Sequence, residues 1–282
     1  MPHPSEAPQL STYASIMVPL DLGSEAERRA RFACALADQF SSRVIGIAAE
    51  EIIPPMYFEG SFAVAPSVIE LEESRIAENL KQAEKLFRQV AGTRKNVEWR
   101  SKTGMPASFI TQQSRACDLI VVSRQGSGDE TQGTMAVSPG DLIMESGRPI
   151  LVVPPLRDHV FANRIVIAWK DTREARRAVW DSLPFLKRAD AIFVVAIGGN
   201  DRKESANDVS AYLARHGIAS RTLLRPTPDG SVAEDILQVA DDEGANLIVS
   251  GAYGHSRARE WMFGGVTRAL LDDAPVCCLM SH

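Results

Sequence analysis

The sequence lacks a hydrophobic segment long enough to cross a lipid bilayer. None of its apolar runs approaches the roughly 20 residues that a transmembrane helix requires. Its first residues, MPHPSEAPQLST, have neither a basic flank nor an apolar stretch, which argues against a targeting signal and indicates a short disordered lead. We therefore expect a cytoplasmic protein that does not insert into a membrane.

The sequence is also poor in residue patterns that bind metals or nucleic acids. Its 4 cysteines, Cys34, Cys117, Cys277 and Cys278, have no metal-like spacing, and we expect Cys34 and Cys117 to be buried core residues. The net charge of −5 gives no electrostatic reason to expect a nucleic-acid partner, because a phosphate backbone requires concentrated Lys and Arg. No nucleophile, helical His pair or Cys cluster stands out, so we expect a binding site with no metal of its own and no catalytic residues.

Apolar strand patterns alternate with helical patterns along the 282 residues, which is more than one typical domain. This alternation predicts parallel sheets with right-handed crossovers, and ligands bound outside the carboxyl ends of the strands. The expected strands are 15–20, 43–49, 97–100, 119–122 and 150–153, then 164–169, 191–197, 220–224, 247–249 and 276–279. Ser24, Pro106, Thr172 and Ser231 are expected at helix starts, and longer helices are expected at about 68–90 and 203–216.

Two pairs of matching segments indicate an internal repeat. Residues 18–21 with Glu25-Ala26 match residues 167–170 with Glu174-Ala175, and residues 148–152 match residues 274–278. The diproline Pro154-Pro155 and the polar residues after it mark the boundary between the copies. We therefore predict domains at residues 13–155 and 161–282.

A glycine-rich stretch follows the apolar run at Leu247 to Val249. It contains Gly251 and Gly254, then, after nine further residues, the pair Gly264-Gly265 at the start of a helical pattern. Glycine lets backbone approach a ligand closely, and the free N–H groups at a helix start favour anionic oxygens. The stretch therefore indicates a phosphate site, although glycine is common wherever a strand turns into a helix.

The frame Gly-x-x-Gly, nine residues, Gly, short helix, Pro275 and strand resembles the universal stress protein family. The resemblance covers nearly all of the chain after the first dozen residues. It implies two tandem five-stranded parallel α/β domains of Rossmann-like, adenine nucleotide alpha hydrolase-like fold, whose last strands pair to form an internal pseudo-dimer. It further implies an adenine nucleotide as ligand, ATP with or without Mg²⁺, and a role in the stress response.

The second copy retains most of the family's binding residues. By the resemblance, the nucleotide would contact Ala168, Trp169, Lys170, Gly251, Tyr253, Gly254, His255, Gly264, Gly265, Val266 and Thr267. Gly265 replaces the expected Ser or Thr, and Lys170 replaces the expected adenine-side Asp. Lys170 could face a phosphate or be solvated, Trp169 could contact a base or pack in the core, and His255 could belong to a solvated loop.

The first copy shows the reverse pattern. Asp21 stands where the family has its adenine-side Asp, but it could equally be a turn or helix-capping carboxylate. Ser138-Pro139 stands in place of two glycines, and proline supplies no N–H for a phosphate. We therefore place the nucleotide in the second copy.

Three functions remain open at this point. The first is an ATP-binding sensor or regulator, with at most weak ATP hydrolysis. The second is a nucleotide-free interaction protein that retains the fold, and protein partners or a homo-oligomer stay open for both. In the third, a small apolar ligand binds beneath the apolar loop from Pro54 to Pro66.

Overall fold

The structure is a computed structural model that describes residues 12–52, 66–124, 133–155, 162–228, 230–254 and 265–282. Several predictions fall outside these residues. They concern the lead at 1–11, most of the apolar loop between Pro54 and Pro66, the glycines at 126 and 128, the polar boundary after Pro155, and the stretch 255–264 with His255 and Gly264. The described parts of each half are treated below as the first half (12–155) and the second half (162–282).

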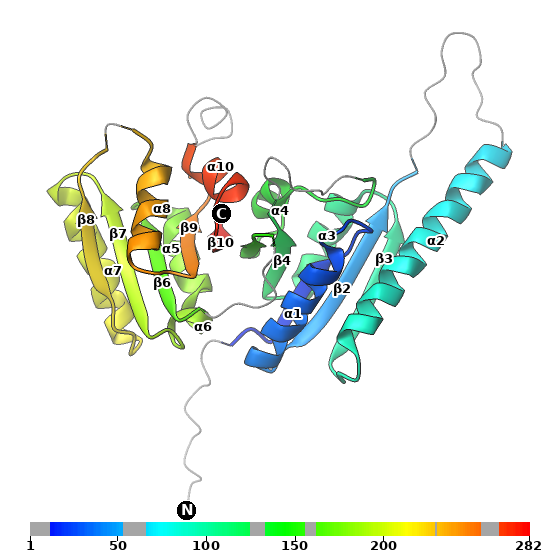
Figure 1. The fold of residues 1–282 in the computed structure, drawn as a ribbon, viewed down its shortest axis with the longest axis horizontal. Coiled ribbons are helices and arrows are strands. Elements are labelled where there is room, and N and C mark those ends of the chain that lie inside the picture. The colour runs from blue at the N-terminus through cyan, green and yellow to red at the C-terminus, as the bar shows by residue number, and fades with distance from the viewer. Residues whose placement is uncertain (1–11, 53–65, 125–132, 156–161, 229, 255–264) are drawn as a thin grey trace, which may run out of the picture.

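The first half alternates strands and helices as predicted (Figure 1). Its elements are β1 (Ser15–Pro19), α1 (Ala26–Phe40), β2 (Arg43–Glu50), α2 (Pro66–Ala91), β3 (Val97–Thr103), α3 (Pro106–Gln113), the 3-10 turn η1 (Ser114–Ala116), β4 (Leu119–Ser123), α4 (Pro139–Glu145) and β5 (Ile150–Val153).

The second half repeats this order, with one additional short helix, α6. Its elements are β6 (Arg164–Trp169), α5 (Arg173–Asp181), α6 (Leu183–Leu186), β7 (Ala191–Ile197), α7 (Asn200–Arg215), β8 (Arg221–Arg225), α8 (Val232–Asp242), β9 (Leu247–Gly251), α10 (Gly265–Asp272) and β10 (Cys277–Ser281). Thr172 and Ser231 cap α5 and α8 with their side chains, as the sequence predicts. The prediction for Ser24 is wrong by one residue, because Glu25 is the N-cap of α1 and makes no capping bond with its side chain.

The strands of the described residues form one sheet in the order β3-β2-β1-β4-β5-β10-β9-β6-β7-β8. Within each half every strand pair is parallel. The halves join where β10 pairs with β5 in antiparallel register, with Leu279 opposite Leu151. This joint confirms the predicted α/β fold with its two five-stranded parallel halves and the pairing of their closing strands.

Helices cover both faces of the sheet, and inner strands such as β1, β5 and β7 are apolar on both sides. Residues of α1, α2, α5, α6 and α7 pack on one face, and residues of α3, α4, α8 and α10 pack on the other. Successive side chains of β1 point to opposite faces of the sheet. Ile16 and Val18 pack in the core on the α1 side, and Met17 packs in the core on the α3 side. All four cysteines are buried, which confirms the expectation for Cys34 and Cys117.

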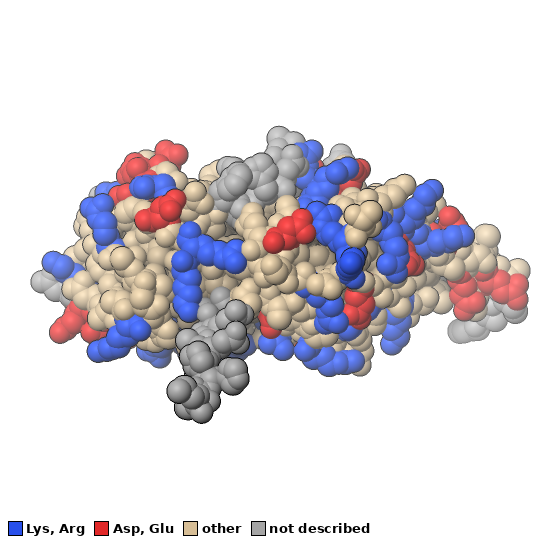
Figure 2. Space-filling view, turned by 90° about the horizontal axis from the view of Figure 1, so that it is seen from below, with Lys and Arg blue, Asp and Glu red and all other residues tan. Residues whose placement is uncertain are grey.

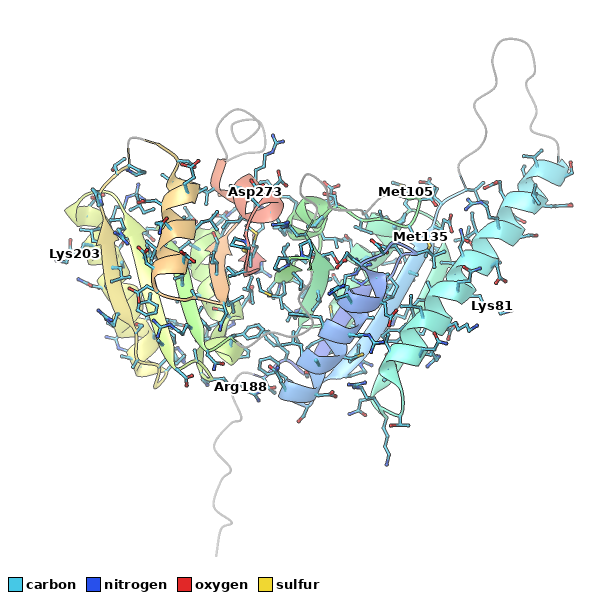
Figure 3. The ribbon with its side chains drawn as sticks, viewed as in Figure 1. Lys81, Met105, Met135, Arg188, Lys203 and Asp273 are labelled. Atoms are coloured by element: carbon cyan, nitrogen blue, oxygen red, sulfur yellow. The ribbon has the colours of Figure 1, made fainter. Side chains whose placement is uncertain are left out.

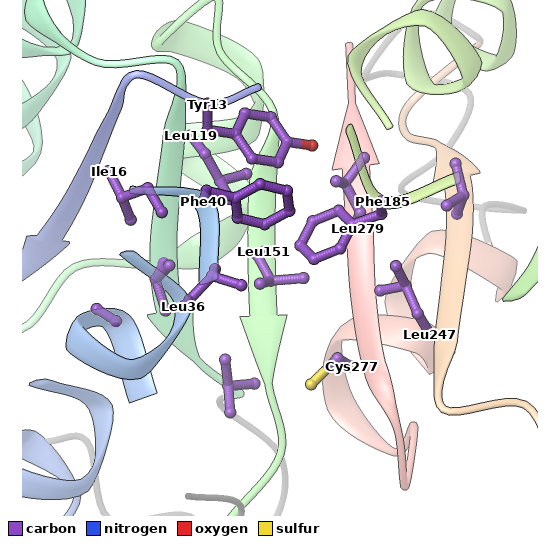
Figure 4. Close-up of a cluster of buried hydrophobic side chains, with 14 of the residues drawn as sticks. Tyr13, Ile16, Leu36, Phe40, Leu119, Leu151, Phe185, Leu247, Cys277 and Leu279 are labelled. Atoms are coloured by element: carbon purple, nitrogen blue, oxygen red, sulfur yellow. The ribbon is translucent and has the colours of Figure 1, made fainter. Parts of the chain in front are cut away.

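An aromatic cluster closes the joint on one face of the sheet (Figure 4). The rings of Tyr13 and Phe40 from the first half meet Phe185 of α6, with centroids 5.1 to 5.5 Å apart. The Tyr13 hydroxyl donates a hydrogen bond to the Asp181 carbonyl at 2.6 Å. Arg188, which lies at the junction of the halves in Figure 3, places its guanidinium 4.4 Å from the Phe40 ring centroid. Side-chain packing therefore reinforces the strand pairing between the halves.

Basic and acidic side chains are interspersed on the face shown in Figure 2, and acidic side chains gather at the end where α2 begins. Among the described residues, no helix is both long enough and apolar enough to span a bilayer.

Candidate ligand cavity of the second half

A cavity of about 940 Å³ opens at the carboxyl ends of β6, β7 and β9. This is the edge at which open parallel sheets bind ligands, and the volume lies within the range of small-molecule sites. The cavity is lined by Ala168, Trp169, Lys170, Thr172, Ala175, Val195, Ile197, Gly198, Gly199, Asp201, Arg202, Thr227, Ser231, Val232, Ile236, Ser250, Gly251, Tyr253, Gly254, Gly265, Val266 and Thr267.

The cavity brings together most of the residues that the sequence suggests for the site. They are Ala168, Trp169, Lys170, Gly251, Tyr253, Gly254, Gly265, Val266 and Thr267. His255 and Gly264 lie outside the described residues. Asp21 is not part of this lining, because it follows β1 in the other half of the sheet.

The loop after β9 is shaped by backbone contacts. A Cβ at Gly251 would lie 2.5 Å from the backbone nitrogen of Ala175, so Gly251 lets α5 pack directly against the end of β9. Tyr253 has a left-handed backbone with φ 55°, and its N–H donates to the Thr267 hydroxyl of α10 at 3.4 Å. Gly251 therefore serves close packing within the protein, and the turn at Tyr253 brings Gly254 into the cavity wall.

In the first turn of α5, a side chain of the turn itself accepts a hydrogen bond from a backbone N–H group. The Thr172 hydroxyl accepts from the Ala175 N–H, and the buried Glu174 carboxylate contacts Arg173. Burial by itself would raise the pKa of Glu174, but hydrogen bonds from Arg173, its own backbone and Thr172 outweigh burial and lower it. Because the carboxylate is ionised and neutralises the helix start, α5 is not the helix that would attract a ligand phosphate.

Helix α10 offers a more open start. Among the described residues, no atom outside its own helix backbone lies within 4 Å of the place where a Cβ on Gly265 would be, and Gly265, Val266 and Thr267 all line the cavity. The free N–H groups of a helical first turn bind anionic oxygens. The cavity therefore has one end suited to a phosphate group.

The opposite end lies beyond β6 and β7. Trp169 is almost fully buried, and its indole N–H donates to the Ser205 hydroxyl of α7 at 3.1 Å, so it packs in the core while lining the cavity. The sequence reading missed the residues after β7 and β8, which include Gly198, Gly199, Asp201, Arg202, Thr227 and Ser231. The rule that ligands lie beyond strand ends could have identified them if applied to each predicted strand.

The matching place in the first half is filled by an arginine. Sheet register matches Ile16 with Ile165 and Leu119 with Leu247, so Pro19, Asp21 and Ser123 correspond to Ala168, Lys170 and Gly251. Arg29 of α1 is buried and donates to the Pro19 carbonyl, the Ser123 hydroxyl and the Asp21 carboxylate at 2.8 to 2.9 Å.

Asp21 also accepts a hydrogen bond from the Gly23 N–H at 3.0 Å. These contacts match the alternative reading of Asp21 as a turn carboxylate. Its contact with adenine stays a prediction.

Among the described residues, no group of three or more His, Cys, Asp or Glu side chains is placed to hold a metal ion. The arrangement around the cavity is suited to hydrogen bonding and charge pairing with a bound molecule.

Known proteins resemble this chain in both sequence and fold. The model of the universal stress protein family matches residues 178–282, the part of the second half that contains the glycine loop. A universal stress protein of Synechocystis sp. is 20% identical over 248 residues, 81% of this chain and 84% of that protein. The second half of the chain therefore matches the universal stress protein family.

Solved universal stress proteins share the fold across both halves. One from Archaeoglobus fulgidus covers 95% of this chain and 98% of its own length, with 13% identity and a TM-score of 0.69. A putative universal stress protein from Pseudomonas aeruginosa covers 96% of this chain and 93% of its own length, with 15% identity and a TM-score of 0.54. At these identities the likeness concerns the fold, and the ligand must be argued from the cavity.

Proposed function

We propose that this chain acts as a universal stress protein and binds an adenine nucleotide, ATP, in the cavity of the second half. Its phosphates would lie at the start of α10, and its nucleoside would lie along the ends of β6 and β7. The observation that carries the proposal is that one cavity joins the glycine loop, the open start of α10 and three strand ends. Backbone N–H groups would hold the phosphates, and apolar side chains such as Val195 and Ile236 would contact the nucleoside.

The proposal includes regulation by the ligand and no catalytic step. Tyr253 lines the cavity, yet its hydroxyl oxygen lies only 2.7 Å from where a Cβ on Gly140 of α4 would be. The loop that would contact the phosphates therefore also contacts the first half. A change in this loop on binding can alter the surface near α4, which supports a sensor or regulator in the cytoplasm.

The test uses Gly265→Asp in the full chain. No described residue would clash with a side chain there, and an acidic residue in the first turn is favoured by the helix dipole, so the variant should fold. Its carboxylate would occupy the phosphate end and repel the ligand. We expect ATP affinity to fall by more than about tenfold, since like charges at close range cost more than about 1.4 kcal/mol in a partly dehydrated site.

The matched control is Met105→Asp, which adds a carboxylate at the exposed start of α3 in the first half, away from the cavity. Calorimetric titration with ATP should give wild-type affinity for this variant. Equal ATP affinity for wild type and Gly265→Asp would contradict the phosphate assignment. If well-folded wild type, stripped of ligand, binds no nucleotide, the chain is better explained as a nucleotide-free interaction protein.

A further inference from the structure

Two cationic side chains line the cavity at the end away from α10. Lys170 directly follows β6, and Arg202 lies in the first turn of α7, just after β7. The Arg202 side chain is 39% exposed, and its Cγ is 3.0 Å from where a Cβ on Gly198 would be. The stem of Arg202 therefore folds over the end of β7, and this keeps its guanidinium at the cavity wall.

One acidic side chain, Asp201, also lines this end of the cavity. Asp201 is 81% exposed, and one of its carboxylate oxygens lies 3.1 Å from where a Cβ on Gly199 would be, beside the start of α7. Its other oxygen is 3.8 Å from Nε of Arg202, at the limit of an ion pair. The described lining of this end thus includes two cationic side chains, Lys170 and Arg202, and one carboxylate, Asp201.

The internal repeat allows the charge at position 170 to be compared with that at the matching position of the first half. The residue matching Lys170 in the first half is Asp21, whose carboxylate is paired with the buried Arg29. The second half thus has the opposite charge at the same position, and it has Ala178 in place of Arg29. In the first half the carboxylate at this position pairs with a buried arginine, whereas in the second half Lys170 lines the cavity.

The two ends of the cavity are separated by a distance that a nucleoside can bridge. Strand β6 lies between β9 and β7, and neighbouring strands are about 4.8 Å apart. The ends of β9 and β7 are therefore about 10 Å apart. A phosphate at α10 and a second anionic group at Arg202 would lie on opposite sides of a nucleoside held between them.

We infer that the cavity selects nucleotides with a second phosphate on the nucleoside side, remote from the phosphates at α10. Arg202 and Lys170 recognise that phosphate by charge-assisted hydrogen bonds, for which the guanidinium fork is well suited. The inference rests on the proposed function, because it assumes that a nucleotide occupies the cavity, and it adds the class of nucleotide. Both residues act as specificity determinants.

The test compares AMP with adenosine 3′,5′-bisphosphate, which differ by one phosphate on the ribose. Titration of the full chain should give a Kd for the bisphosphate at least about tenfold lower than that for AMP. Arg202→Gln and Lys170→Gln should each reduce this ratio severalfold, and the double variant should bring it near one. A general loss of binding cancels in the ratio, so the readout isolates recognition of the added phosphate.

Arg215→Gln provides the matched control, since it removes an exposed arginine from the other end of α7. It should leave the ratio at the wild-type value. A wild-type ratio near one, or a ratio that survives the double variant, overturns the inference. If ATP binds normally in that case, the proposed function stands alone; if no nucleotide binds at all, both fail.

Discussion

The glycines around the cavity differ in what their missing side chains permit. At Gly251 the absent Cβ leaves room for the backbone of α5, whereas at Gly265 no neighbouring element of the described structure requires its absence. Sequence spacing marked both positions as parts of one phosphate loop. It could not separate them, because close packing of two backbones and close approach of a ligand require the same residue.

Gly251→Ala should therefore destabilise the protein, and Gly265→Ala should not. The new methyl group at position 251 would overlap the backbone of Ala175 and Glu174, which cannot move independently of α5. We expect a loss of about 2 to 3 kcal/mol of unfolding free energy for Gly251→Ala and less than about 0.5 kcal/mol for Gly265→Ala. Urea denaturation of both variants measures this, and similar stabilities would show that α5 does not pack as described.

Glu50 is a fully buried carboxylate at the end of β2. It accepts hydrogen bonds from Arg75 at 2.7 Å, from Asn79 at 2.9 Å and from Thr134. Burial acts to raise its pKa, but the hydrogen bonds from Thr134, Asn79 and Arg75 together lower it below its ordinary value of 4.5. The folded protein therefore favours the ionised form of Glu50.

The lowered pKa of Glu50 makes the stability of the folded protein depend on pH. A carboxyl group with a lowered pKa stabilises the fold above its unfolded pKa and loses that contribution as the pH falls through its folded pKa. Glu50→Gln should cost about 2 kcal/mol at pH 7, and the difference from wild type should shrink as the pH falls below 4.5. Denaturation curves of both proteins between pH 7 and pH 3 test this. A difference that stayed constant over this range would mean that the charge of Glu50 is irrelevant.

At the scale of elements, helix starts were predicted well where a side chain supplies the cap. Thr172 and Ser231 each accept a hydrogen bond from a first-turn N–H. The start of α1 at Glu25 and the start of α3 at Met105 have no side-chain cap, and the first of these was placed one residue early. The short helix α6 was not predicted, because four residues containing Pro184 are too few for a helical period.

The contribution of helix capping can be tested by removing the N-cap side chain of α5 and by adding one to α3. Thr172→Ala deletes the cap of α5 and should cost about 1 kcal/mol, whereas Met105→Asp adds a cap to α3 and should gain about 0.5 to 1 kcal/mol. Met105 is 57% exposed, so the substitution buries no charge. Thermal unfolding should move the two midpoints in opposite directions. A lower midpoint for Met105→Asp would mean that Met105 has packing contacts beyond those described.

At the scale of the whole molecule, the pairing of the closing strands was predicted from the family resemblance and from the tendency of apolar edge strands to be covered, whereas the strand order within each half was not. The register of Leu151 with Leu279 and the aromatic cluster at Phe185 were not, since both depend on how the two sheets meet. For the site, the strand ends pointed to Lys170 and Gly254. The contacts of Arg29 in the first half were not predicted, because Arg29 lies on α1 outside the recognised motifs.

Separate expression of residues 13–155 and 161–282 tests the joint and the domain boundaries together. Each half would expose an apolar edge, β5 or β10, and part of the aromatic cluster. We expect the halves to self-associate or precipitate when alone, and to form a one-to-one complex when coexpressed. Size-exclusion chromatography with light scattering measures both. Soluble monomeric halves as stable as the full chain would be incompatible with this joint.

Strands β5 and β10 pair within one polypeptide, so the two halves can diverge in sequence while they remain paired. Two separate subunits must associate, and they dissociate on dilution. Covalently linked halves instead associate at a fixed and high effective concentration. Every molecule therefore contains one copy of each half. Neither half has to be compatible with a duplicate of itself, so one can fill its pocket with Arg29 while the other keeps an open cavity lined by Lys170. The fused sheet thus allows a division of labour that a dimer of identical subunits could not maintain.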